Sequence, residues 1–181
     1  MTTILRNFTA LYCICYQTCC APKRLLELAE RSRETGFIVV RMVAGETMLD
    51  EIIEGVQIAG ERLMNERKNP VKSVNAGAFG FSVGFTFTEE IRQNYGFGTK
   101  LSLLCEALTK RKKGVLFLID EICASTKEMR VFATTYQNLV GDGMNVAVAM
   151  AGLPNAIASV LNDKILTFLN RAHKVTLIRL K

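Results

Sequence analysis

The sequence predicts an α/β fold in which helices flank a mainly parallel sheet. Short apolar runs at 37–44, 115–119 and 144–151 alternate with amphipathic stretches long enough to form connecting helices. Connections of a dozen or more residues suit parallel strands joined by right-handed crossovers. The run at 144–151 is almost wholly apolar, which is typical of a strand buried on both faces. A chain of 181 residues with 49% hydrophobic and 22% charged residues fits one globular domain.

The first half of the chain contains two predicted helices around one strand. Apolar residues recur at helical spacing over 23–35, and Gly36 is placed to end that helix. The strand at 37–44 is rich in branched residues. A longer amphipathic helix is predicted over 46–68, and Pro70 follows its end.

The stretch at 76–88 has a different pattern. Every second residue from Phe79 to Phe87 is apolar, which predicts a strand, with 71–74 as a candidate hairpin partner. An aromatic strand can also stack nucleic-acid bases. No basic residue interleaves these apolar positions, so core packing is the favoured interpretation.

The second half repeats the alternation of helix and strand. A helix over 99–113 ends in the basic run 110–113, which complements the helix dipole. A helix over 126–140 is predicted to start with a capping box made by Ser125 and Glu128. The other predicted elements are strands at 115–119 and 144–151, a helix at 155–171 and a last strand at 174–180.

Four of the six cysteines fall in the first 20 residues, at positions 13, 15, 19 and 20. Their spacing, CxC followed by CC, is poor for a zinc site, which usually pairs two CxxC-like motifs. Reduced thiols in an apolar strand and its turn are the favoured interpretation. A zinc site and a secretory signal around LYCICY stay as minor alternatives.

The most informative segment is GVLFLIDE, where an apolar strand ends in Asp120 and Glu121. The carboxyl ends of parallel strands line the ligand crevice of such sheets. One carboxylate there can hold Mg²⁺ and a second can polarise an attacking water. Taken alone, the segment is explained equally well as a buried strand followed by a polar turn.

Three motifs in order resemble the core of an AAA+ ATPase, and especially origin-recognition-like ATP-binding proteins of bacteria and mobile elements. They are LFLIDE, VAMAGLP and FLNRAHKVTLIRL. The stretch ELAERSRETGFIVVRM resembles the first helix and second strand of that group, and the Gly- and Phe-rich strand its hairpin insertion. The resemblance covers about residues 24–181. It implies a P-loop NTPase-like fold of the AAA+ type with a β-hairpin insertion.

The resemblance implies roles for three charged residues. Asp120 would be the Walker B aspartate that orients Mg²⁺, and Glu121 the general base for water. Arg171 lies where such proteins place the arginine finger, which acts on a neighbouring subunit; a solvated cation at a helix end is the equally weighted alternative. The implied cofactors are ATP and Mg²⁺, and the implied partners are further copies of the chain or an intact ATPase subunit.

The sequence departs from the family at two places. The sensor position is usually polar, but here it is Ala151 and Gly152, and Asn155 is the nearest polar candidate for the cofactor site. The phosphate loop GxxxxGK[ST] is missing.

No glycine precedes Gly36, and the GKT positions of the loop fall on Cys20, Ala21 and Pro22. Proline offers no N–H to a phosphate, and cysteine and alanine lack the conformational freedom of glycine. Lys23 and Arg24 are nearby cations that could meet an anion, but in a different geometry.

These departures divide the chain into an atypical segment, 1–22, and an AAA+-like core, 23–181, without lid or C-terminal domain. The first segment is either out-of-frame sequence or a natural degeneration. Weak or absent ATP binding and hydrolysis is therefore expected. The alternatives are a non-enzymatic module that docks to an intact ATPase through the Arg171 face, and an unrelated α/β domain.

A net charge of +6 does not demand a nucleic-acid partner, and direct binding to nucleic acid is not expected. No run of 18 apolar residues occurs, so a cytoplasmic protein without a membrane span is expected.

Overall fold

The computed structural model describes residues 10–16, 21–65, 81–83, 86–122, 125–164 and 166–177. Its centre is a five-stranded sheet in the order β2-β5-β6-β1-β7, in which every neighbouring pair is parallel. The predicted parallel sheet is therefore confirmed. Its strands are β1 (Ala10–Tyr16), β2 (Phe37–Val43), β5 (Gly114–Ile122), β6 (Val146–Gly152) and β7 (His173–Leu177).

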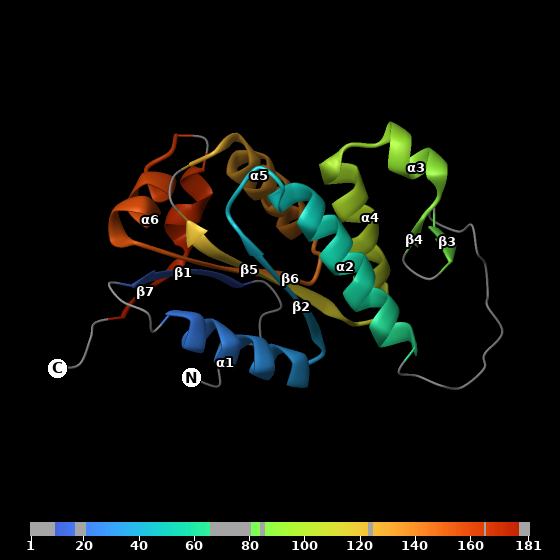
Figure 1. The fold of residues 1–181 in the computed structure, drawn as a ribbon, viewed down its shortest axis with the longest axis horizontal. Coiled ribbons are helices and arrows are strands. Elements are labelled where there is room, and N and C mark those ends of the chain that lie inside the picture. Colours follow the sequence, from blue (N-terminus) through green and yellow to red (C-terminus); the bar gives the residue numbers. More distant parts are fainter. Residues whose placement is uncertain are drawn as a thin grey trace.

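Helices cover the two faces of the sheet unequally. Figure 1 shows α1 alone below the sheet and the other large helices above it. These are α1 (Ala21–Glu34) on one face, and α2 (Met48–Asn65), α4 (Phe97–Lys110), α5 (Lys127–Gly141) and α6 (Pro154–Leu161) on the other. None of the helices in the described ranges is long and apolar enough to cross a membrane.

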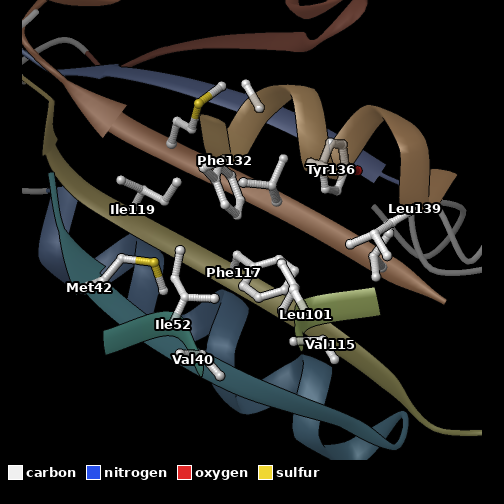
Figure 2. Close-up of a cluster of buried hydrophobic side chains, with 14 of the residues drawn as sticks. Val40, Met42, Ile52, Leu101, Val115, Phe117, Ile119, Phe132, Tyr136 and Leu139 are labelled. Carbon is white, nitrogen blue, oxygen red and sulfur yellow. The ribbon is translucent and has the colours of Figure 1, made fainter. Parts of the chain in front are cut away.

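The interior strand β5 supplies side chains to both faces because successive residues of a strand point in opposite directions. Phe117 and Ile119 are fully buried in the large core under α2, α4, α5 and α6 (Figure 2). Leu116 and Leu118 pack into the smaller core under α1. On that smaller side β6 offers only alanines, Ala147, Ala149 and Ala151. The two strands β5 and β6 are thus buried on both faces, as their apolar sequences predict.

Three helices end in the same way just before a strand begins. The second residue after each end has a left-handed backbone: Gly36 (φ 90°), Lys112 (φ 57°) and Gly143 (φ 70°). After α4, the Lys113 N–H donates to the Leu108 carbonyl at 3.0 Å, which is the longer bond of a Schellman motif. Glycine is the usual residue at this position, so Lys112 carries a backbone strain that the other two ends avoid.

The alternating stretch predicted as one strand folds back on itself. Its described parts are β3 (Phe81–Val83) and β4 (Thr86–Phe87), which pair antiparallel in a separate two-stranded sheet. A single long strand would need a neighbour along its whole length, and the fold-back supplies one. Phe87 is buried in the large core, as expected for core packing. The β-hairpin insertion is confirmed, whereas the proposed partner at 71–74 lies outside the described residues. The short helix α3 (Glu89–Asn94), which follows the hairpin, was not predicted.

The helix predicted over 155–171 is wrong in its second half. Helix α6 ends at Leu161, and a 3₁₀ turn, η2 (Thr167–Arg171), follows before β7. The interruption has a visible cause at Asp163. Its carboxylate accepts hydrogen bonds from Ser125 and Arg130, which hold the loop toward the start of α5.

The capping box predicted at Ser125 and Glu128 is also wrong. Thr126 is the N-cap of α5, and its hydroxyl accepts the Met129 N–H at 3.2 Å. Ser125 instead donates its hydroxyl to Asp163. The physical reason is competition, because the carboxylate of Asp163 is a stronger acceptor for the serine than a backbone group.

Candidate functional site

The carboxyl ends of the strands form the edge at which ligands bind in sheets of this kind. Strands β1 and β6 are neighbours in the middle of the sheet. The helix after β1 packs on one face and the helix after β6 on the opposite face. Two neighbouring connections that leave in opposite directions open a crevice between them. The topology therefore marks the β1–β6 edge, with β5 one strand away, as the candidate site.

Strand β5 ends in a bulge formed by Asp120 and Glu121. The flanking register pairs are Ile119 with Met150 and Ile122 with Gly152. Two residues of β5 thus stand opposite the single residue of β6, Ala151, which defines a β-bulge. Glu121 takes a left-handed backbone with φ 54°, a rare conformation for a long side chain.

The bulge changes which residues of β5 point toward the large core. Without it, the residue after Asp120 would point into the large core, where Ile119 lies. With it, Ile122 is buried in that core, while Glu121 is exposed and Asp120 is half-buried. Both carboxylates are therefore kept out of the apolar core. Strained backbone of this kind concentrates at functional sites.

Hydrogen bonds fix the backbone of this pair. The Glu121 N–H donates to Oδ1 of Asp120 at 2.9 Å. The Ala44 N–H, just beyond β2, donates to the Asp120 carbonyl at 3.1 Å. The bulge is thus tied to β2 on one side and register-matched to β6 on the other.

The donor set fits one kind of metal. Within the described residues, no group of three or more His, Cys, Asp and Glu side chains could hold a metal ion. A closed structural site is therefore not formed there. Mg²⁺ is commonly held by one or two carboxylates together with water and substrate phosphates. Asp120 and Glu121 match that mode of binding.

Two other predicted cofactor residues lie on elements that start at this edge. Lys23 is in the first turn of α1, which follows the carboxyl end of β1. Asn155 is exposed in the first turn of α6, which follows β6. The edge thus brings together Asp120, Glu121 and the helix starts that carry Lys23 and Asn155. Residues 17–20, where a phosphate loop would stand, lie outside the described residues.

Arg171 lies elsewhere in the fold. It is exposed at the end of η2, whose backbone is anchored by buried Leu166 and Leu169. The register across the sheet puts His173, the first residue of β7, level with Leu118 of β5. Arg171 therefore precedes the start of its strand, whereas Asp120 stands at the end of β5. Strands β5 and β7 are also separated by two strands, about 14 Å across the sheet.

Sequence reasoning missed the bulge and the cluster around Asp163. The bulge had a signal, because apolar residues at 119 and 122 break period two. The cluster had none, since Ser125 and Arg130 lie 38 and 33 residues from Asp163. The Arg130 Nε donates to Oδ2 of Asp163 at 2.8 Å, and the carboxylate side chain is only 7% exposed.

The structure describes only some of the cysteines discussed above. Cys13 and Cys15 lie on β1, and Cys19 and Cys20 fall outside the described residues. Cys105 is buried in the large core, and that burial raises the pKa of its thiol to about 12. Such a thiol stays protonated and inert at neutral pH.

Comparison with known proteins supports the fold. No family model matches the chain, and no curated protein matches it. Solved structures do. Cdc6p from Pyrobaculum aerophilum aligns over 93% of this chain with a TM-score of 0.56 and 13% identity. The ORC2 protein of Aeropyrum pernix, solved in ADPNP–ADP complexes, aligns over 93% with the same score and identity.

The chain spans 38% of the length of the first protein and 41% of the second. Identity this low establishes a shared fold and nothing finer. The fold that the sequence motifs implied, a P-loop NTPase-like core of the AAA+ type, is therefore confirmed.

Proposed function

We propose that this chain is a partial or degenerate AAA+ ATP-binding core of the cytoplasm, which keeps the carboxylates for Mg²⁺ and water but lacks a phosphate loop. The observation that carries the proposal is the Asp120–Glu121 pair, held by a bulge at the carboxyl end of a central strand. It stands one strand from the crevice between β1 and β6. ATP with Mg²⁺ is the cofactor this arrangement suits best.

The two carboxylates have different tasks in the proposal. Mg²⁺ supplies charge neutralisation at the phosphates when it is bound. Asp120 is half-buried and its Oδ1 is oriented by the Glu121 N–H, so it is suited to hold the hydrated cation. Glu121 is exposed at the edge and is suited to accept a proton from an attacking water.

Phosphate binding is the weak part of the site. A phosphate loop wraps its anion in backbone N–H groups and neutralises it with a lysine. Pro22 removes one N–H at a position where the loop needs it, and no glycine precedes Gly36. Lys23 and Asn155, at the starts of α1 and α6, remain as phosphate contacts. Loose binding and slow or absent hydrolysis follow from this set.

Arg171 would act on a partner rather than on its own chain. It precedes β7, whose first residue is level with Leu118 of β5, and β7 lies about 14 Å from β5 across the sheet. Its backbone is nevertheless anchored by buried leucines, and its side chain is exposed. A second copy of the chain, or an intact ATPase subunit, is the partner whose bound phosphates it would meet.

The proposal is tested by titrating the purified chain with a fluorescent ATP analogue, with and without Mg²⁺. We expect no saturation at micromolar analogue. At millimolar analogue, any signal is expected to depend on Mg²⁺ and to lose that dependence in Asp120→Asn. Tight, Mg²⁺-dependent binding by the unaltered chain would show that the loop is not broken.

A non-enzymatic module that docks to an intact ATPase is the second candidate. The exposed Arg171 on an anchored turn favours it, because this feature does not need the chain's own nucleotide site. The chain is mixed with a competent relative, and ATP turnover is measured. We expect the chain to raise turnover and Arg171→Ala to abolish the increase, whereas Arg92→Ala, on α3, leaves it intact. If the Arg171→Ala chain raises ATP turnover as much as the unaltered chain does, the docking role of Arg171 is refuted.

A further inference from the structure

We propose that Gly152 is a positioning residue for the two carboxylates, because it leaves the space into which the β5 bulge fits. The proposal rests on the proposed function, since it concerns how Asp120 and Glu121 are both kept out of the large core. Gly152 is the last residue of β6 and is buried. It pairs with Ile122, the first residue after the bulge.

The space at Gly152 is taken by backbone. A Cβ atom added there would lie 2.7 Å from the Ile122 carbonyl oxygen and 3.1 Å from the Ile122 Cβ. A contact of 2.7 Å between carbon and a backbone oxygen is too close to persist. A backbone atom cannot rotate away as the end of a side chain can. Any larger residue at 152 must therefore push β5 and β6 apart at this pair.

The close contact at Gly152 and the strained backbone of Glu121 have the same structural origin. Glu121 reaches φ 54° so that Ile122 can return to the large core, and this brings the Ile122 carbonyl against Gly152. If the carbonyl is pushed away, the bulge loses the register that closes it. Glu121 would then revert toward extended backbone, whose side chain points at the core.

The bulge matters because neighbouring residues of a regular strand face opposite sides. Asp120 and Glu121 could then not serve the same cation and water. With the bulge, both stay outside the large core, and Oδ1 of Asp120 accepts the Glu121 N–H. Gly152 thus acts on the carboxylates through Ile122 without touching any ligand.

The test is a thermal double-mutant cycle between Gly152→Ala and deletion of Glu121. Deletion removes the bulged residue and leaves Ile119, Asp120 and Ile122 in regular alternation. In the natural chain we expect Gly152→Ala to lower the melting temperature by roughly 4–8 °C. In the deletion chain we expect the same substitution to cost less than about 2 °C, because the carbonyl no longer presses on residue 152.

The matched control is Gly141→Ala in α5, where an added Cβ meets nothing within 4 Å. We expect it to leave the melting temperature within about 2 °C in both chains. If Gly152→Ala alone does not fold, folding of the double variant is the rescue expected. An equal loss with and without Glu121 would overturn the proposal, since Gly152 would then serve packing alone.

A second measurement connects the geometry to the cation. Mn²⁺ alone broadens the NMR signals of amides near its site, and we expect broadening at Ala44 and Glu121. Gly152→Ala is expected to need roughly ten-fold more Mn²⁺ for the same broadening, whereas Gly141→Ala needs no more. Equal broadening in Gly152→Ala would overturn the positioning role. Absence of broadening in the natural chain would instead refute the proposed cation site, while the thermal cycle still decides the role of Gly152.

Discussion

Replacing Phe117 with alanine is the most direct perturbation of the layer that holds the sheet to its helices. Phe117 lies in the middle of β5 and is 0% exposed. Its ring meets the ring of Phe132 edge-on, with centroids 5.4 Å apart and an interplanar angle of 77° (Figure 2). Removing a buried phenylalanine costs the transfer free energy of its ring and leaves a cavity that a close-packed core cannot refill.

We expect Phe117→Ala to lower the free energy of unfolding by about 3–5 kcal/mol. Urea unfolding followed by circular dichroism measures the change. Val43→Ala is the control, because Val43 is 50% exposed at the end of β2 and should change stability by less than about 0.5 kcal/mol. A Phe117→Ala loss below roughly 1.5 kcal/mol would refute the reasoning, because the ring would then not fill a central, dry core.

A cycle with Phe132→Ala separates the ring contact from simple burial. The two rings in edge-on contact should couple by about 0.5–1.5 kcal/mol beyond their burial. The two single losses should therefore sum to more than the loss of the double variant. Additive losses would mean that the rings do not meet as described.

Three further predictions concern stability. Lys112→Gly should raise the free energy of unfolding by about 0.5–1 kcal/mol, because glycine adopts φ 57° without steric cost; a loss in a urea melt contradicts this. Burial raises the Cys105 pKa from 9.0 to about 12, so the unfolded chain releases this proton first, and stability falls as pH rises from about 9 to 12. Between pH 8 and 10 the natural chain should lose on the order of 1 kcal/mol more than Cys105→Ala, and equal pH slopes would refute it. Arg130→Met should cost roughly 1–2 kcal/mol, because the 7% exposed carboxylate of Asp163 loses a charged donor. Lys127→Met, at an exposed position of the same helix, should leave the free energy of unfolding unchanged. Equal losses in Arg130→Met and Lys127→Met would contradict a stabilising role of the Arg130–Asp163 pair.

The sheet could be predicted because its determinants are local. Each strand is a short apolar run, and the intervening helices are long enough to force parallel pairing. The position of Asp120 and Glu121 near the carboxyl end of β5 is predictable for the same reason, since it follows from strand direction alone.

The bulge and the break after α6 could not be predicted in the same way. The φ of Glu121 depends on the missing side chain at Gly152, which is on another strand. The end of α6 depends on Asp163, whose partners come from the start of α5. In both places a contact distant in sequence overrides the local preference.

The central claim is that the carboxyl edge is assembled for ATP and Mg²⁺ and binds them weakly because the phosphate loop is missing. The pattern GxxxxGKT can be written into the chain by Cys15→Gly, Cys20→Gly, Ala21→Lys and Pro22→Thr. An unchanged melting profile checks that the grafted chain keeps its fold. We predict that this chain binds a fluorescent ATP analogue at micromolar concentration only with Mg²⁺, and that adding Asp120→Asn removes the Mg²⁺ dependence. A folded, grafted chain that binds no better than the natural one would contradict the claim.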